Sequence, residues 1–408
     1  MSVDAGGFDR GPGRRPDRGL DGGFDGGLDG ALVAQVRAML GSAGGAVLPT
    51  LGQVEEAVRS SGRVVGSDVL AGLARQVRAE LVGAGVVQPL LDDPDVTDVL
   101  VNPDGAVWFD RGAGLGRWTR RLDGPRDVRA LAVRLAAASG ARLDDQQPTV
   151  DARLADGTRL HALVAPLCEG GAAISLRTHR PRSFTLDELV ARAALPAGWA
   201  PVLAGLVARR ANLLVSGATG TGKTTLLAAL LGLVPASERV VCVEEARELS
   251  PGHPHVVHLC TRRANVEGSG AVGLDELVRN ALRMRPDRIV LGECRGVEVR
   301  DVLLALNTGH DGGMATVHAN TAADVPARLE ALAALAGLGR DAVAAQAASA
   351  LDVVVHLRRD PVTRVRYVAE LGAVGRDARG ELVVEPAATW DGGPCAPRPG
   401  PRWDVVAP

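Results

Sequence analysis

A run of eight residues, 217–224, constrains the fold of this chain more than any other feature of its sequence. It reads Gly-Ala-Thr-Gly-Thr-Gly-Lys-Thr and matches the pattern G-x-x-x-x-G-K-[ST] in full. An apolar segment, 212–216, precedes the run, and a segment rich in Leu and Ala follows it. A strand, a glycine-rich loop and a helix in this order form a P-loop, in which backbone N–H groups and the helix N-terminus surround a phosphate.

The lysine of this run is informative because the chain uses lysine nowhere else. Of 46 basic residues, 45 are arginine, and Lys223 is the exception. A compact ammonium can reach the β- and γ-phosphates of a nucleotide, whereas a planar, forked guanidinium is a poor substitute. We therefore predict ATP and Mg²⁺ as cofactors, with Thr224 as a direct Mg²⁺ ligand; a glycine turn without nucleotide is the alternative. The residues predicted to hold phosphates and metal are Gly217, Ala218, Thr219, Gly220, Thr221, Gly222, Lys223, Thr224 and Thr225.

Short apolar segments alternate with helical segments from residue 211 onward, which predicts a mostly parallel sheet with helices on both faces. Several expected strands are followed by residues suited to phosphate chemistry: Glu244 and Glu245 after 240–243, Glu293 after 288–292, and His318 after 314–317. The carboxyl ends of parallel strands share one edge of a sheet, so these side chains should lie near Lys223.

Phosphoryl transfer assigns a role to each of these strand-end residues. Glu293 would orient or deprotonate the attacking water, and Glu244 or Glu245 would hold Mg²⁺ through its water shell. His318 would contact the γ-phosphate. Each residue also has a structural alternative, because a strand-end glutamate often caps a helix and a histidine can simply tie the strand end to a loop.

Composition along the chain predicts five segments. They are a disordered Gly/Asp/Arg-rich leader over 1–30, a helical segment over 31–88, a small α+β domain over 89–185, an ATPase domain over 186–372, and a Pro/Gly-rich tail over 373–408. The leader contains FDGG and LDGG repeats and is too poor in apolar residues to form a core.

Charge and composition argue against several classes of function. The formal net charge is −2 and aromatic residues make up 2% of the chain, so the basic surplus or stacking platforms of a nucleic-acid binder are missing and nucleic acid is an unlikely partner. No apolar stretch is long enough to predict a membrane span. Five scattered cysteines without a CxxC pair predict free thiols in a reducing cytoplasm.

The ordered motifs resemble those of the secretion and pilus-assembly ATPases of the type II/type IV secretion superfamily, and most closely the CpaF/TadA-like branch of Tad (Flp) pilus assembly. The similar stretches beyond the P-loop are 95–102, 150–160, 174–177, the Asp box at 243–249, the Walker B region at 282–296, the segment 307–312 and the His box at 316–320. The resemblance covers residues from about 85 to 370.

This resemblance implies a homohexameric ring in the cytoplasm, attached peripherally to the inner membrane through platform proteins of a pilus or secretion machine. It implies a RecA-like ATPase domain preceded by a PAS-like N-terminal domain. Arginines of the N-terminal domain would complete the nucleotide site, and Arg153, Arg159 and Arg177 occupy matching positions. Arg177 is the first choice for the γ-phosphate, with a solvated strand face as the alternative for each arginine.

The sequence departs from the family pattern at two positions. The Asp box usually reads Glu-Asp, whereas this chain has Glu244-Glu245, so the second carboxylate reaches one methylene further. Cys294 replaces the usual apolar residue after Glu293, which we interpret as a small core substitution. The tetracysteine zinc module of some type II relatives has no counterpart, which favours the Tad branch.

Three functions follow as hypotheses from the residues and the resemblance. The first is a ring ATPase that powers Tad/Flp-type pilus assembly or protein secretion. The second is a conjugation-type ATPase that assists DNA transfer. The third is a nucleotide-responsive scaffold with little turnover, against which Lys223, Glu293 and His318 argue together.

Overall fold

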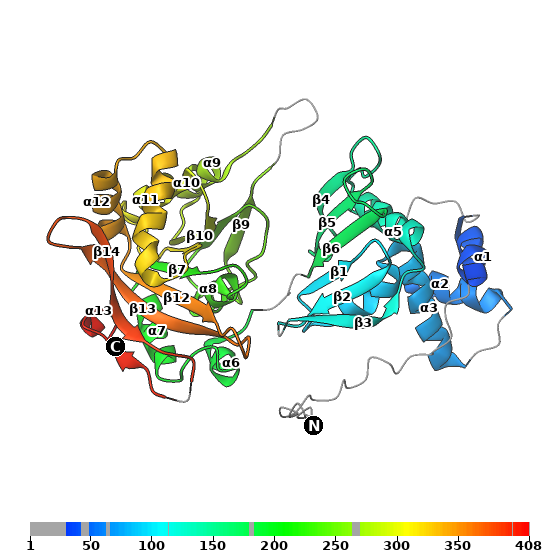
Figure 1. Cartoon of the computed structure of the whole chain (residues 1–408), viewed down its shortest axis with the longest axis horizontal. Helices are drawn as coiled ribbons and strands as arrows, with labels where there is room; N and C mark the ends of the chain where they lie inside the picture. Colours follow the sequence, from blue (N-terminus) through cyan, green and yellow to red (C-terminus); the bar gives the residue numbers. More distant parts are fainter. Residues whose placement is uncertain are drawn as a thin grey trace, which may run out of the picture. The chain divides into compact units, whose positions relative to one another are not determined.

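The computed structural model describes residues 30–41, 49–62, 66–112, 114–178, 183–262, 270–393 and 395–407 (Figure 1). The leader predicted for residues 1–30 lies outside these ranges except for its last residue. Two compact units divide the chain, unit 1 over residues 1–178 and unit 2 over residues 179–408. Each unit has its own apolar core or cores.

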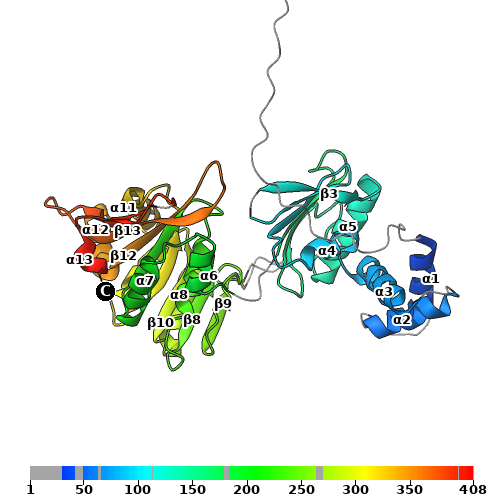
Figure 2. The same ribbon diagram turned by 90° about the horizontal axis from the view of Figure 1, so that it is seen from below.

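Unit 1 contains three helices that pack around a small core of their own (Figure 2). They are α1 (Gly30–Gly41), α2 (Leu51–Ser60) and α3 (Ser67–Val82). Thr50 begins α2 with a capping box: its hydroxyl accepts a hydrogen bond from the Gln53 N–H, and the Gln53 side chain accepts one from the Thr50 N–H. Leu32, Val54 and Val77, one from each helix, are buried together.

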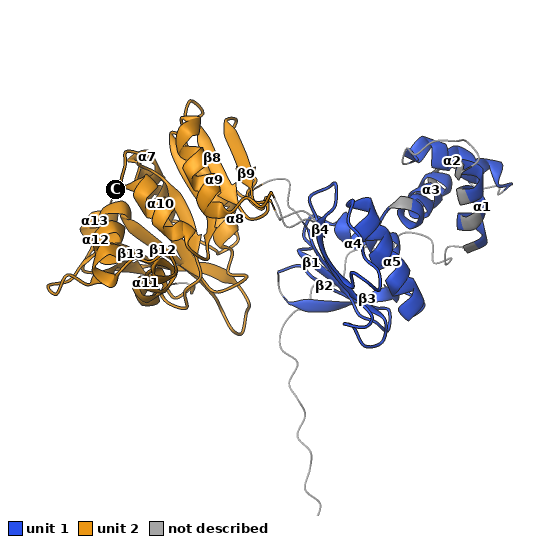
Figure 3. Cartoon of the chain, turned by 90° about the horizontal axis from the view of Figure 1, so that it is seen from above, with its two compact units in different colours: residues 1–178 blue, residues 179–408 orange. Residues whose placement is uncertain are grey.

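The described strands of unit 1 form one six-stranded antiparallel sheet in the order β3-β2-β1-β6-β5-β4. The strands of this sheet and the helices around it are, in chain order, η1 (Gly85–Val87), α4 (Gln88–Leu91), β1 (Asp98–Val101), β2 (Ala106–Asp110), β3 (Leu115–Arg121), α5 (Pro125–Ala138), β4 (Thr149–Arg153), β5 (Arg159–Val164) and β6 (Ala172–Arg177). Buried and exposed residues alternate along β5, and the apolar face packs against α5 (Figure 3). The opposite face therefore presents polar side chains.

The described strands of unit 2 form a nine-stranded sheet in the order β15-β14-β13-β12-β7-β11-β10-β8-β9. Neighbours from β12 to β9 are parallel, and β13 to β15 extend the sheet antiparallel. The strands are β7 (Leu213–Gly217), β8 (Val240–Glu244), β9 (Val256–Cys260), β10 (Arg288–Cys294), β11 (Met314–Val317), β12 (Val353–Arg359), β13 (Arg366–Arg376), β14 (Leu382–Thr389) and β15 (Arg398–Pro399).

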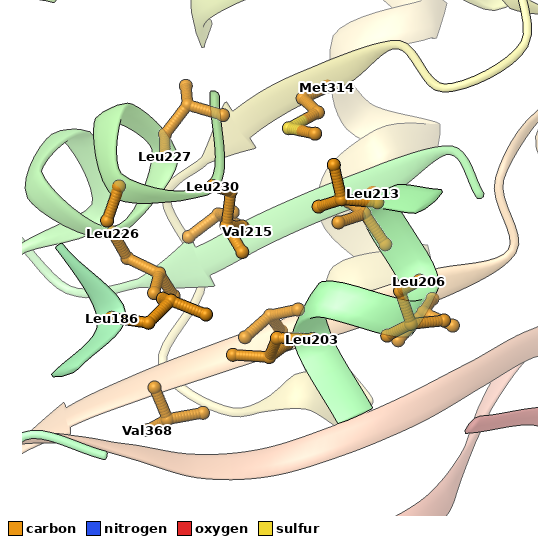
Figure 4. Close-up of a cluster of buried hydrophobic side chains, with 14 of the residues drawn as sticks. Leu186, Leu203, Leu206, Leu213, Val215, Leu226, Leu227, Leu230, Met314 and Val368 are labelled. Atoms are coloured by element: carbon orange, nitrogen blue, oxygen red, sulfur yellow. The ribbon is translucent and has the colours of Figure 1, made fainter. Parts of the chain in front are cut away.

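Helices cover both faces of this sheet. They are α6 (Leu186–Ala191), α7 (Trp199–Ala208), α8 (Lys223–Leu231), α9 (Leu274–Ala281), η2 (Leu282–Met284), α10 (Glu298–Leu306), η3 (Ala322–Asp324), α11 (Val325–Leu335), α12 (Arg340–Ala350) and α13 (Trp403–Val406). Along β7, Leu213 and Val215 join the core under α7 and α8, whereas Leu214 joins the core under α10 and α12. Figure 4 shows the first of these cores. The predicted parallel sheet with helices on both faces is confirmed.

The described residues of 373–407 differ from the Pro/Gly-rich tail that composition predicted. They complete β13 and form β14, β15 and α13. Pro386 lies inside β14, although proline is usually excluded from a strand interior. It is accommodated opposite Gly372, where the pairing of β13 and β14 shifts register. Ala387, Ala388 and Val406 are fully buried, so this segment belongs to the core of unit 2.

Candidate active site

The P-loop begins at the buried end of β7. Gly217, the last residue of that strand, has a φ of 152°, and a Cβ at this position would lie 2.7 Å from the Leu357 carbonyl oxygen of β12. Glycine is required there because both the backbone conformation and the close approach of β12 exclude a side chain. Residues 218–220 at the loop tip are exposed, whereas Thr221 and Lys223 are buried.

Lys223 points back under its own loop. Its Nζ donates hydrogen bonds to the carbonyl oxygens of Gly217 (3.0 Å) and Ala218 (3.1 Å), and to Nδ1 of His318 (3.1 Å). Thr224 and Thr225 follow, half-buried, in the first turn of α8. The lysine is therefore positioned at the phosphate loop, as the sequence predicted, and is held there by carbonyls and one histidine.

His318 connects this lysine to Glu293. Because an ammonium only donates, Nδ1 of His318 accepts, and the proton of the neutral ring lies on Nε2. Nε2 is 2.7 Å from Oε1 of Glu293, a close contact without hydrogen-bond geometry. Burial, and then the charge of Lys223, lower the pKa of His318 below its ordinary value. The histidine is therefore neutral at neutral pH.

A β-bulge in β10 determines the direction of the Glu293 side chain. Leu291 of β10 pairs with Ala315 of β11, and Cys294 pairs with Val317. Between these two pairs, β10 therefore has one residue more than β11. Such a bulge redirects the side chains beside it. Gly292 is needed at the bulge, since a Cβ there would lie 2.9 Å from Cγ of Glu244 on the next strand. Cys294 itself is buried in the core, where burial raises the pKa of its thiol.

Arg295 binds Glu293 and Glu245 at once. Its Nη2 donates to Oε2 of Glu293 (2.8 Å), its Nε lies 2.8 Å from Oε1 of Glu293, and its Nη1 donates to Oε2 of Glu245 (2.7 Å). Burial alone would raise the pKa of Glu293, but the hydrogen bond from Arg295 and the charges of Arg295 and Lys223 lower it. Glu293 is therefore ionised at neutral pH.

These contacts form one polar series that follows the strand order of the sheet. Its members are Lys223, His318, Glu293, Arg295 and Glu245. Lys223 begins α8 after the loop that follows β7, and the other members lie at the ends of β11, β10 and β8. In the sheet, β7, β11, β10 and β8 are neighbours in that order. The structure thus brings together five side chains, four of which the sequence predicted for the site; Arg295 was missed.

Glu244 has different partners. Its side chain is buried, and Oε1 accepts hydrogen bonds from the backbone N–H groups of Glu248 and Leu249, both at 2.8 Å. Oε2 lies 3.4 Å from Nδ1 of His258. These contacts brace the loop after β8. The water-mediated Mg²⁺ role expected of Glu244 or Glu245 stays a prediction.

Two further residues beside the P-loop were not predicted from the sequence. His356 on β12 is buried, and its Nδ1 lies 2.8 Å from the hydroxyl of Ser216, the residue before Gly217. Arg366 at the start of β13 donates from Nε to the Gly220 carbonyl oxygen at 2.7 Å. Both come from the C-terminal part of the chain, more than 130 residues beyond the loop, and no local motif marks them.

In unit 1, the three arginines predicted for the site lie side by side. Arg153 on β4 pairs with Arg159 on β5, and Arg159 pairs with Arg177 on β6. Residues directly opposite each other in antiparallel strands share a face, so the three form an arginine row on one face of the sheet. Asp98 of β1 continues this row beside Arg177.

Comparison with known proteins places the chain in a family. The sequence profile described as "Type II/IV secretion system protein" matches residues 80–384. A putative conjugal transfer protein of Mycobacterium tuberculosis is 51% identical over 330 residues, which span 79% of this chain and 92% of that protein. The conjugal transfer protein TrbB of Rhizobium radiobacter is 32% identical over 286 residues, spanning 69% of this chain and 85% of TrbB. This chain belongs to the type II/IV secretion system protein family.

The fold of this secretion-family protein also has a counterpart of known structure. The ATPase DotB of Legionella pneumophila matches with a TM-score of 0.51 and 20% identity, over 70% of this chain and 80% of DotB. The fold of unit 2 is RecA-like. Within the residues that the structure describes, every helix of the secretion-family protein is too short or too polar to cross a bilayer.

The residues around the P-loop fit a nucleotide and its metal. The glycine loop, the buried lysine and the helix N-terminus of α8 match the needs of a phosphate chain. In the described part of this family member, no three His, Cys, Asp or Glu side chains gather as a metal site of their own. Mg²⁺ in nucleotide sites keeps several waters and shares phosphate oxygens with few protein ligands. The role of Thr224 as a direct Mg²⁺ ligand stays a prediction.

Proposed function

We propose that this secretion-family protein hydrolyses ATP and uses the energy to drive Tad/Flp-type pilus assembly or protein secretion. The observation that best supports hydrolysis is the polar series, which connects Lys223 at the P-loop to the Glu293 carboxylate through His318. A scaffold that only binds nucleotide needs the loop and the lysine. It does not need a histidine that connects that lysine to an ionised carboxylate.

The roles of the residues follow from their protonation states. Lys223 exchanges its carbonyl partners for the β- and γ-phosphates, a charge-assisted contact. Glu293, ionised, accepts a hydrogen bond from the attacking water and orients it. Neutral His318 accepts from Lys223 at Nδ1 and points Nε2–H at Glu293, so the positions of cation and carboxylate depend on each other.

Mg²⁺ supplies charge neutralisation on the phosphates when it is bound. Thr224 would hold it directly through its hydroxyl. Glu245 is the better candidate of the two Asp-box residues for a water-mediated contact, because it is half-exposed. Glu244 already accepts two backbone hydrogen bonds.

The arginine row is proposed to complete the nucleotide site, with Arg177 nearest the γ-phosphate, in the PAS-like domain that the resemblance implies for unit 1. Support comes from the pairing of Arg153, Arg159 and Arg177 in one row, since three guanidiniums on one face form a concentrated anion-attracting surface. Arg177→Ala should lower turnover more than Arg153→Ala. Equal turnover in all three alanine variants and the wild type would remove the row from the site.

Steady-state phosphate release tests hydrolysis most directly. Lys223→Ala should lose ATP binding and turnover. Glu293→Gln, which keeps the shape of the side chain, should bind ATP with an affinity near that of the wild type while losing turnover. Unchanged turnover in Glu293→Gln would refute its assigned role, and a wild type that binds ATP without turning it over would favour the scaffold.

Assembly into a hexamer at the cytoplasmic face of the inner membrane, through platform proteins, completes the proposal. Mass measurement in solution with and without ATP tests the ring, and a fully active monomer would contradict it. Co-purification with membrane platform proteins tests the partners. Lys223→Ala is the matched variant, because it changes a buried residue and leaves the exposed surface of the protein unaltered.

A conjugation-type ATPase is the second candidate, and a specific observation favours it. Both relatives described above, at 51% and 32% identity, are named as conjugal transfer proteins. Deleting this gene from its host distinguishes the two candidate functions. Loss of surface pili with normal DNA transfer would support the pilus function, and loss of DNA transfer with normal pili would support conjugation.

A further inference from the structure

Arg295 makes three polar contacts to two carboxylates, yet neither phosphate binding nor water activation requires it directly. Its guanidinium donates a hydrogen bond from Nη2 to Oε2 of Glu293 and one from Nη1 to Glu245, and its Nε lies 2.8 Å from Oε1 of Glu293 as an ion-pair contact without hydrogen-bond geometry. The fork of a guanidinium fixes both the distance and the plane of a carboxylate, whereas a single-point cation fixes only the distance. The orientation of Glu293 is therefore set largely by Arg295.

The backbone of Arg295 is itself held in place. Oε1 of Glu298 accepts hydrogen bonds from the N–H groups of Arg295 (2.5 Å) and Gly296 (2.8 Å). Glu298 is the first residue of α10 and is buried. A buried carboxylate with two backbone donors fixes the turn between β10 and α10, so the backbone position from which the Arg295 side chain extends is fixed as well.

Glu245 holds the other side of the guanidinium. Glu245 and Arg295 are each about half-exposed, and an isolated ion pair of that kind contributes little. Here the same guanidinium is also bound by Glu293, whose side chain is mostly buried. The three groups therefore form a network rather than a single surface pair, and such networks are where charge geometry matters most.

We propose that Arg295 is a positioning residue for hydrolysis, which keeps the Glu293 carboxylate in the plane needed to orient water, and that Glu245 anchors Arg295. This inference rests on the proposed ATP hydrolysis. It also accounts for the second glutamate of Glu244-Glu245, because an aspartate at 245 would be one methylene too short for the 2.7 Å contact to Arg295.

The first test compares Arg295→Ala and Arg295→Lys with the wild type in steady-state ATP turnover. A misplaced carboxylate should lower kcat about 10- to 100-fold in Arg295→Ala, as expected for an error of about 1 Å in a reacting group. KM for ATP should change less than threefold, since the phosphate loop is intact. Arg295→Lys should recover only part of kcat, because lysine lacks the fork. Arg300→Ala, an exposed arginine on the following helix, is the matched control and should match the wild type.

The second test asks whether Glu245 acts through Arg295. Glu245→Asp and Glu245→Gln should each lower kcat by several-fold, and Glu245→Gln should lower kcat less in the Arg295→Ala background than in the wild type, because only the proposed Mg²⁺ contact is then left to lose. Fully additive effects would overturn the anchoring role. An Arg295→Ala kcat equal to that of the wild type, or a loss caused by KM or by a lower unfolding temperature alone, would overturn the positioning role.

Glu293→Gln separates this inference from the proposed function. If the wild type hydrolyses ATP and Glu293→Gln does not, the function stands, and an active Arg295→Ala refutes only the role of Arg295. If the wild type does not hydrolyse ATP, the function and the role fall together.

Discussion

The ends of β8 and β10 lie on neighbouring parallel strands, and each carries a glutamate, yet the two carboxylates have opposite surroundings. Glu244 ends β8 in a buried site and accepts hydrogen bonds from backbone N–H groups of its own loop. Among the described residues, Glu293 near the end of β10 accepts its hydrogen bond from a side chain, that of Arg295, and lies against the ring of His318. A carboxylate bound by backbone stabilises a fold, whereas one bound by side chains can change partners during a reaction.

The largest expected effect tests the chemical side of this comparison. Glu293→Gln should reduce kcat by about 10³-fold, in the range of losing a group that orients or activates water. Its free energy of unfolding should stay within about 1 kcal/mol of the wild type, because no backbone group loses a partner. Phosphate release and urea unfolding on the same protein measure both. A large loss of stability would mean that Glu293, too, has a structural role.

Glu244→Ala tests the structural side. Two backbone N–H groups would lose their acceptor, so the free energy of unfolding should fall by about 3–4 kcal/mol. Turnover of the folded fraction should fall less than tenfold. Glu244→Gln, which keeps one carbonyl oxygen as an acceptor, is the control and should lose less stability. If Glu244→Ala were as stable as the wild type, Glu244 would not have the structural role that distinguishes it from Glu293.

Two histidines differ in the same way as the two glutamates. His318 belongs to the polar series, whereas His356 is buried beneath the P-loop and should affect stability. Burial, with the charge of Arg358, lowers the pKa of His356 from 6.5 to about 4. The unfolded state then binds a proton more readily than the folded state, so stability is fully present above pH 6.5 and falls as pH drops toward 4. The loss should reach about 3 kcal/mol. Urea unfolding between pH 4 and 8 should show this slope in the wild type and a flatter curve in His356→Gln. Equal slopes would contradict the prediction.

The smallest expected effect concerns His318. His318→Asn should lower kcat about tenfold, worth about 1.4 kcal/mol, because Lys223 and Glu293 stay in place but lose the group between them. Stability should hardly change. If His318→Asn lowered stability as much as Glu244→Ala does, the histidine would belong with the structural residues and not with the polar series.

Local sequence patterns predicted the P-loop, the parallel sheet and the carboxylates, because each depends on residues close together in the chain. The sequence placed His318 at the same sheet edge as Lys223 but could not predict their direct contact, since that contact requires β11 to lie beside β7 and no single segment determines the strand order. Arg366 reaches Gly220 across 146 residues with no motif. Arg295 was predictable in part: it stands two residues after Glu293 at a strand end, where alternate residues share a face.

The pairing of β14 against β13 determines where this protein can be shortened. The guanidinium of Arg209, at the end of α7, donates to the carbonyl oxygens of Val405 (2.6 Å) and Ala407 (3.2 Å), which closes α13 over the core. Cutting at residue 372 would divide β13 and uncover the apolar surface beneath α13. A truncated gene product of that length should be degraded or insoluble, and limited proteolysis of the intact protein should spare this boundary.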